Sequence, residues 1–280
     1  MLSYRHAFHA GNHADVFKHL VLTLLLQTLS NKEKPFFYLD THSGAGQYPL
    51  DSGFALKNRE SASGIERLWS LKEFPEMVRD YLAVVRSINP SGRLRRYPGS
   101  PRIARSFLRL RDRLALCELH PNEAQALTEE FQGDQQVTVH HGDCYQGLNA
   151  LLPPRERRGL VLIDPAFELK DERRRLVEAL QLAYQRWSTG IFAIWYPIQD
   201  RVTPEDLLRR IEKLGLRKIL LVEFRILGYD EPLRLNGSGM LIVNPPWKLD
   251  EQLHQLLPWL WETLAVEGQG GWRVEWLVPE

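Results

Sequence analysis

Short runs of branched apolar residues recur along the chain and alternate with segments of helical periodicity. Such runs, bounded by turn residues, are typical of buried strands. Between several of them lie amphipathic segments, for example NEAQALTEEF and PEDLLRRIEKLG, the second of which ends at Gly215. Strands that alternate with helices predict a parallel, doubly wound α/β sheet with helices on both faces. The predicted strands cover residues 36–39, 114–117, 137–140, 160–163, 191–195, 219–224 and 240–243.

Two intervals depart from this alternation. The last two strands, on either side of the 228–239 turn region, have no helix between them, which predicts an antiparallel hairpin at the sheet edge. After the first strand and its glycine turn, the next strand arrives only at 114, and helical stretches fill 64–71 and 75–88. We interpret residues 49–96 as a helical insertion subdomain. The main domain is then formed by residues 1–48 and 97–280.

Composition limits the possible partners. A chain of 280 residues with 44% hydrophobic content can bury a large core. Its 36 basic and 35 acidic residues nearly balance, so an anionic partner must meet a local patch of positive charge. Arginine clusters could form a nucleic-acid surface or simply solvated helix faces. They comprise Arg93, Arg95, Arg96, Arg102, Arg105, Arg109, Arg111, Arg113, Arg155, Arg157, Arg158 and residues 173–175.

The cysteines and the N-terminus exclude several classes of protein. Cys117 and Cys144 have no CxxC spacing, so neither a disulfide framework nor a zinc site is predicted, and a reducing cytoplasm is favoured. The polar N-terminus lacks the apolar core of a signal peptide, and no apolar run is long enough to cross a bilayer. The spacing of His6, His9, His13 and His19 matches no common zinc pattern, so we predict no metal.

A glycine turn and two acids follow the first three strands. Glycines in DTHSGAG, residues 40–46, would let the backbone approach a ligand at the carboxyl end of the first strand, although a plain tight turn uses the same residues. Glu118, after the second long strand, can accept both hydroxyls of a ribose, and Asp143, after the third, can accept the amino group of an adenine. This order indicates a nucleoside-containing cofactor on a Rossmann-like sheet, and it is typical of S-adenosyl-L-methionine.

The fourth strand ends in Asp164-Pro165-Ala166-Phe167. This DPAF segment resembles the Asp/Asn/Ser-Pro-Pro-aromatic motif of methyltransferases that act on adenine N6 or cytosine N4. The chemistry explains the residue types: a carboxylate and a main-chain carbonyl would accept the hydrogens of an exocyclic amine as its nitrogen attacks a methyl group. The aromatic ring would stack on a base taken out of its stack.

A second segment, NPPW at residues 244–247, fits this motif more literally. It follows the hairpin strand, far from the glycine turn in sheet order. Because sites gather at the switch point of such a sheet, we interpret it as a structural strand terminus.

The whole chain resembles the ribosomal RNA large-subunit methyltransferase J family, which methylates an adenine N6 in 23S ribosomal RNA. The resemblance rests on YRHAFHAGNHADVFKH, YLDTHSGAG, YPGSP, ELHP, IDPAFE, GIFAIWYP and SGMLIVNPPWKL. It implies a class I S-adenosyl-L-methionine-dependent methyltransferase fold, with residues 1–20 folding over cofactor and substrate as a lid. The implied enzyme is a cytoplasmic monomer that acts on 23S ribosomal RNA before subunit assembly buries the target.

The resemblance also implies roles for individual residues. Asp164, with Pro165 and Phe167, would be catalytic, and Tyr4 and His6 would lie near the target base. Two departures weaken the match. The family usually shows DPPY where this chain has DPAF, and it often has glycine at position 144, where this chain has Cys144. The implied cofactor-binding residues are Lys18, His19, His42, Ser100, Glu118, Asp143, the backbone at Cys144, and Asp164.

Other functions compete with this prediction. Asp164 followed by Glu168 and Lys170 has the spacing of magnesium nucleases, and the family has carried an older label linking it to use of external DNA. That nuclease motif needs its Glu and Lys on a strand, whereas here they follow a proline turn. A DNA methyltransferase, or a non-catalytic RNA-binding relative with a disabled site, are the remaining alternatives.

Overall fold

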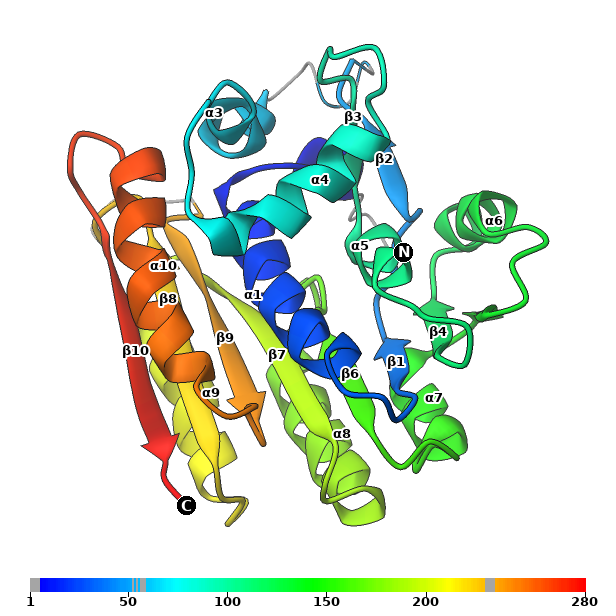
Figure 1. Cartoon of the computed structure of the whole chain (residues 1–280). Coiled ribbons are helices and arrows are strands. Elements are labelled where there is room, and N and C mark those ends of the chain that lie inside the picture. The colour runs from blue at the N-terminus through cyan, green and yellow to red at the C-terminus, as the bar shows by residue number, and fades with distance from the viewer. Residues whose placement is uncertain (1–5, 52, 54, 56–58, 230–234) are drawn as a thin grey trace.

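A computed structural model describes residues 6–51, 53, 55, 59–229 and 235–280. Its centre is one eight-stranded sheet with the strand order β10-β8-β9-β7-β6-β1-β4-β5 (Figure 1). The strands from β7 to β5 are parallel, whereas β9 is antiparallel to β7 and β8, and β10 is antiparallel to β8. The strands are β1 (Phe37–Asp40), β4 (Arg113–Glu118), β5 (Val137–His141), β6 (Gly159–Ile163), β7 (Ile191–Ile198), β8 (Ile219–Arg225), β9 (Gly237–Val243) and β10 (Gly271–Val278).

All seven predicted strands are present, and the predicted α/β class with its antiparallel hairpin is confirmed. The hairpin formed by β8 and β9 is followed by one further strand, β10, which pairs with β8 and forms the outermost strand. The sequence pattern did not predict β10. Its residues are only half-buried or exposed on both faces, so the strand lacks the apolar alternation by which the others were found.

Helices cover both faces of the sheet, as predicted (Figure 1). One hydrophobic core packs α1, α4, α5 and α10 against one face, and a second packs α7, α8 and α9 against the other. The helices are α1 (His13–Ser30), α4 (Arg79–Ser87), α5 (Ser100–Ser106), α6 (Pro121–Glu130), α7 (Cys144–Leu151), α8 (Glu172–Arg186), α9 (Val202–Glu212) and α10 (Leu249–Leu264). None of the helices in the described ranges is long and apolar enough to span a membrane.

Helix α1 is the most deeply buried of these helices, although its first turns carry charged side chains. Its apolar residues surround the axis, and a helix that is apolar all round is buried on every side. Asn12 caps it by accepting a hydrogen bond from the backbone N–H of Asp15. His13, Asp15, Lys18 and His19 are therefore carried into the interior together.

The segment from β2 to β3, which lies between β1 and α5 in the chain, forms a lobe over the N-terminal end of α1 (Figure 1). Its outer strands pair antiparallel, and its helical part is tied to the main body at two points. Ile65 N–H donates to the carbonyl of Gly11, and the guanidinium of Arg67 donates to the carbonyl of Leu264 at the end of α10. The lobe contains β2 (Gln47–Pro49), η2 (Glu60–Ser63), α3 (Ile65–Trp69), η3 (Glu76–Val78), α4 and β3 (Arg96–Pro98).

Candidate active site

A cavity of about 1270 Å³ lies at the carboxyl ends of β1, β4 and β6. Ligand pockets usually measure roughly 300–1,000 Å³, so this cavity has room for a cofactor and a second ligand. Parallel strands place the residues that follow them at one edge of the sheet. The cavity wall accordingly includes the glycine turn, Glu118, Asp143 and the DPAF segment, together with the start of α1.

The glycine turn and the acid of the second strand are joined directly. Glu118 Oε2 accepts the backbone N–H of Gly44 at 2.7 Å, and Oε1 accepts that of His120 at 2.8 Å. Gly44 has φ +60°, and an added Cβ would meet the hydroxyl of Tyr48 at 1.9 Å, so only glycine fits this turn. Both oxygens of Glu118 keep a lone pair for a further donor, which fits the two hydroxyls of a ribose.

Asp143 is held at the N-terminus of α7. Its Oδ1 accepts the backbone N–H of Tyr145 at 2.9 Å, and its Oδ2 accepts Arg175 at 2.9 Å. His42 packs edge-on against Tyr145, and burial lowers the pKa of His42 to about 4, so this imidazole is neutral at pH 7. This part of the cavity wall thus combines the Asp143 carboxylate with the uncharged ring of His42, and such a pair can contact the polar edge and the flat face of a nucleoside.

Of three further residues that were predicted to bind the cofactor, two line the cavity and the side chain of the third is not described. Ser100 begins α5, is buried and lines the cavity. His19 also lines it, and its Nδ1 shares a hydrogen bond of 2.8 Å with the hydroxyl of Tyr97. Cys144 begins α7, but its side chain is outside the described residues, as is Tyr4.

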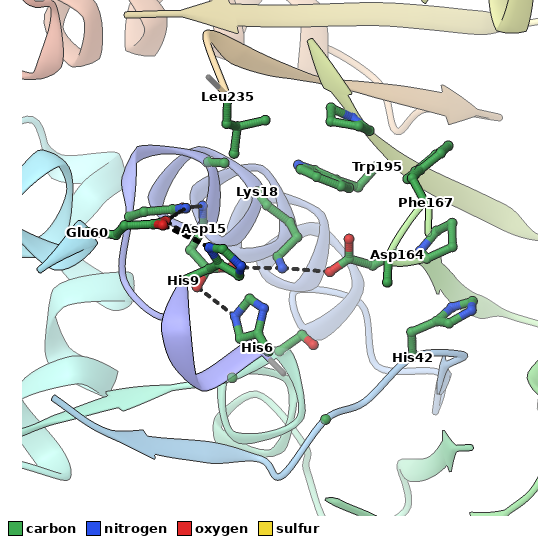
Figure 2. A pocket seen from close by; sticks show the side chains of 18 of the residues that line it. His6, His9, Asp15, Lys18, His42, Glu60, Asp164, Phe167, Trp195 and Leu235 are labelled. Atoms are coloured by element: carbon green, nitrogen blue, oxygen red, sulfur yellow. Dashed lines mark hydrogen bonds and ion pairs between the residues drawn. The ribbon is translucent and has the colours of Figure 1, made fainter. Parts of the chain in front are cut away.

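The DPAF segment closes the cavity opposite α1. Pro165 is buried, and Phe167 adopts φ +54°, a backbone conformation that bulky residues rarely take. Its ring meets that of Trp195, from β7, at a centroid distance of 6.1 Å and an interplanar angle of 61°. Figure 2 shows Phe167 and Trp195 beside Asp164. A strained residue held by packing at a cavity wall is a feature of functional sites.

A chain of polar contacts, comprising a hydrogen bond and two ion pairs, joins the N-terminal segment to the DPAF segment (Figure 2). His6 Nε2 lies 2.8 Å from Asp15 Oδ2, Lys18 Nζ lies 2.9 Å from Asp15 Oδ1, and Lys18 Nζ lies 2.6 Å from Asp164 Oδ2. Burial alone would lower the pKa of Lys18, but the carboxylates of Asp15 and Asp164 raise it above its usual value. Lys18 is therefore a fixed cation between two carboxylates.

Asp15 was not predicted as a site residue. It is 3% exposed and also accepts the backbone N–H of Gly11. Burial would raise the pKa of Asp15, but His6 and Lys18 hold it well below its usual range. The sequence did carry a signal: Asp15 and Lys18 are one helical turn apart, which places their side chains on the same face.

The other N-terminal histidines make separate contacts. His9 Nδ1 lies 2.9 Å from Glu60 of the inserted lobe, and Asn12 donates to the same carboxylate. Burial lowers the pKa of His13 to about 4. Within the described ranges, no group of three or more His, Cys, Asp or Glu residues is placed to hold a metal ion.

NPPW lies at the opposite end of the sheet from DPAF, in accord with its interpretation as a strand terminus. Strand β9 runs antiparallel to β7, so Val243 pairs with Phe192 at the start of that strand. The Asn244 amide donates to the carbonyls of Ser188 and Gly190, which fixes a turn, and Trp247 is exposed. Glu168 and Lys170, by contrast, follow DPAF outside any strand, so the context of a nuclease motif is missing.

Half of the arginines in the predicted basic clusters form ion pairs with carboxylates. Arg102 pairs with Glu130, and Arg175 with Asp143. Arg105, Arg109, Arg113, Arg155 and Arg174 likewise pair with carboxylates. These clusters therefore offer less free positive charge than the sequence suggested.

Comparison with known proteins gives one consistent set of matches. A family model described as "Ribosomal RNA large subunit methyltransferase D, RlmJ" matches residues 33–278. Proteins named "Ribosomal RNA large subunit methyltransferase J" from Escherichia coli (strain K12) and Haemophilus influenzae are each 47% identical to this chain, over the full length of both proteins. The crystal structure of protein LPL1258 from Legionella pneumophila is 38% identical, with a TM-score of 0.89, and the match covers 96% of this chain and 98% of that one.

Proposed function

The chain belongs to the RlmJ family of ribosomal RNA large subunit methyltransferases, and we propose that it methylates the N6 atom of an adenine in 23S ribosomal RNA. The observation that carries this proposal is the position of Asp164 in the cavity, next to Phe167 and at the carboxyl end of β6. A carboxylate beside an aromatic ring matches the needs of an exocyclic amine on a stacked base.

The residues of the cavity divide into two groups. Glu118, Asp143, His42 and Ser100 would hold S-adenosyl-L-methionine, because they combine carboxylate acceptors with a neutral ring at the ends of β1, β4 and β5. When bound, this cofactor supplies an electrophilic methyl group. His6, Asp164, Pro165 and Phe167 would face the target base. Lys18, which the family resemblance places near the cofactor, pairs with Asp164 and would lie between the two groups.

Asp164 would orient the amine and accept hydrogen bonds from it. One of its oxygens, Oδ2, already accepts from Lys18, and among the described residues nothing donates to the other, Oδ1. An amine that donates to Oδ1 and to the main-chain carbonyl of the DPAF turn would regain lone-pair density on its nitrogen. Lys18 keeps the carboxylate in place while this happens, and Phe167 would stack on the base.

The form of the RNA and the state of the enzyme complete the proposal. We expect a monomer that acts in the cytoplasm on protein-free 23S ribosomal RNA or an early assembly intermediate. The cavity lies between the sheet and the inserted lobe, so a base must leave its stack to enter it.

The test uses labelled S-adenosyl-L-methionine and the purified full chain, with unmodified 23S transcript, assembled large subunits and double-stranded DNA as separate substrates. The proposal predicts N6-methyladenosine in the transcript, found by nucleoside mass spectrometry, and little product from assembled subunits or DNA. A different methylated nucleoside, or a preference for DNA, would contradict it.

A further inference from the structure

Two arginines share one aromatic ring beside the cavity. The guanidinium of Arg225, at the end of β8, lies 3.9 Å from the centroid of the Tyr229 ring, and that of Arg201, before α9, lies 4.7 Å from it. Arg201 is exposed, and Arg225 and Tyr229 are half-buried. Their chain neighbours Gln199, Ile226 and Leu227 line the cavity that contains Asp164. Each member of this group, the Arg201–Tyr229–Arg225 cluster, therefore lies within two positions along the chain of a residue of the cavity wall.

The sheet is shaped to let Arg225 take this position. Both cross-strand partners of Arg225 are glycines, Gly237 on β9 and Gly271 on β10. A Cβ at Gly237 would lie 2.3 Å from the carbonyl oxygen of Phe224 and 2.5 Å from Arg225 Cγ, so a larger residue there would clash with the backbone of β8 and with the base of the arginine side chain. Arg225 thus lies between two glycines at the end of the sheet. Its position reduces the conformational entropy that the side chain would lose on binding a ligand.

Neither Arg201 nor Arg225 forms an ion pair with a carboxylate in the part of the chain that the structure describes. Two of the arginines that line the cavity differ in this respect, because Arg59 pairs with Glu66 and Arg175 pairs with Asp143. The third, Arg67, donates to main-chain carbonyls. Two like charges held over one ring repel each other, and an anion bound between or beside them would remove that cost.

We propose that Arg201 and Arg225, supported by Tyr229, bind a backbone phosphate of the RNA next to the nucleotide whose base enters the cavity. This inference rests on the proposed function, because it takes the substrate to be RNA. Planar guanidiniums bind phosphate oxygens in pairs, and phosphate contacts fix where a nucleic acid lies without reading its sequence. The cluster would hold the strand while the base turns toward Phe167.

The test measures RNA affinity directly, without methyl transfer. Filter binding of unmodified 23S transcript is followed across a range of salt concentrations for the wild type and for the double variant Arg201→Gln, Arg225→Gln. The matched control is Arg217→Gln, because Arg217 is an exposed arginine just before β8, at the end of that strand opposite Arg225. The binding of S-adenosyl-L-methionine is measured in parallel and should be the same in all three proteins.

The double variant should bind the transcript about tenfold more weakly, and the slope of log K against log salt should fall by about one. The Arg217→Gln control should match the wild type. Equal affinities and slopes in all proteins, an equal loss in the control, or no RNA binding by the wild type would each overturn the proposed phosphate site. Methyl transfer is a separate readout: a wild type that binds RNA through the cluster but forms no N6-methyladenosine would refute the proposed reaction and leave the phosphate site standing.

Discussion

The Nζ atom of Lys18 lies 2.6 Å from Oδ2 of Asp164, a residue 146 positions later in the chain. This ion pair joins the start of α1 to the turn after β6, across the cavity (Figure 2). It also gives Lys18 a second carboxylate besides Asp15. The N-terminal helix and the DPAF segment therefore form one site. A substitution in either segment should change the contacts that position the other.

Asp15→Asn tests how far stability depends on this arrangement. The substitution keeps the shape of the side chain but leaves Lys18 buried with one carboxylate where it had two, so the free energy of unfolding should fall by about 3 kcal/mol. Urea unfolding at pH 7.5 measures this change. Asp206→Asn is the control, because it removes an exposed i,i+4 pair and should cost no more than about 0.5 kcal/mol. Equal losses in the two variants would contradict the role given to Asp15.

His13 should make stability depend on pH. Its pKa in the folded protein is lowered to about 4 by burial, against 6.5 in the unfolded chain, so the unfolded state takes up the proton first. The free energy of unfolding is therefore unaffected by His13 above pH 6.5, and it decreases as the pH falls toward 4 because protonation favours the unfolded state. His13→Gln should remove up to about 3 kcal/mol of this loss, measured by urea unfolding at pH 7.5 and pH 4.5.

The control for that prediction is His254→Gln, since His254 is exposed on α10. This variant should show the same pH dependence as the wild type. If His13→Gln and the wild type lost stability in parallel between the two pH values, the burial of a neutral imidazole at position 13 would not be the cause.

Ala166→Pro tests the departure of this chain from the DPPY pattern. No hydrogen bond from the N–H of Ala166 is found among the described residues, and Ala166 is exposed, so proline has room there. A proline should stiffen the turn that holds Phe167 at φ +54°, stabilise the fold by about 0.5 kcal/mol and raise kcat severalfold. Thermal unfolding and steady-state kinetics with 23S transcript check both effects. A loss of stability above about 1 kcal/mol would mean that the turn needs a backbone conformation closed to proline.

Much of the fold followed from the sequence because each central strand is a short apolar run that ends in a turn. The positions of Glu118, Asp143 and Asp164 then followed from strand order, since parallel strands bring their carboxyl ends to one edge. The sequence also favoured DPAF over NPPW as the reactive segment, because DPAF follows a parallel strand whereas NPPW follows a strand of the antiparallel hairpin.

The remainder depended on contacts between distant segments. Helix α1 carries its polar side chains into the interior, and apart from the Asp15–Lys18 pair within the helix, the sequence pattern does not indicate their partners. Lys18 forms an ion pair with Asp164, and His9 contacts Glu60, which belongs to the inserted lobe. The Arg201–Tyr229–Arg225 cluster likewise combines the residue before α9, a loop residue and the last residue of β8, so no local motif could reveal it.

The most direct test of the central claim compares Asp164→Asn with Trp247→Ala in single-turnover methyl transfer to 23S transcript. Asp164→Asn keeps the size of the side chain but removes its charge, whereas Trp247→Ala alters the exposed end of NPPW. The account predicts that Asp164→Asn lowers the rate of N6-methyladenosine formation by at least about a hundredfold at saturating S-adenosyl-L-methionine, and that Trp247→Ala keeps the wild-type rate. A wild-type rate in Asp164→Asn, or a comparable loss in Trp247→Ala, would contradict the placement of the reaction at DPAF.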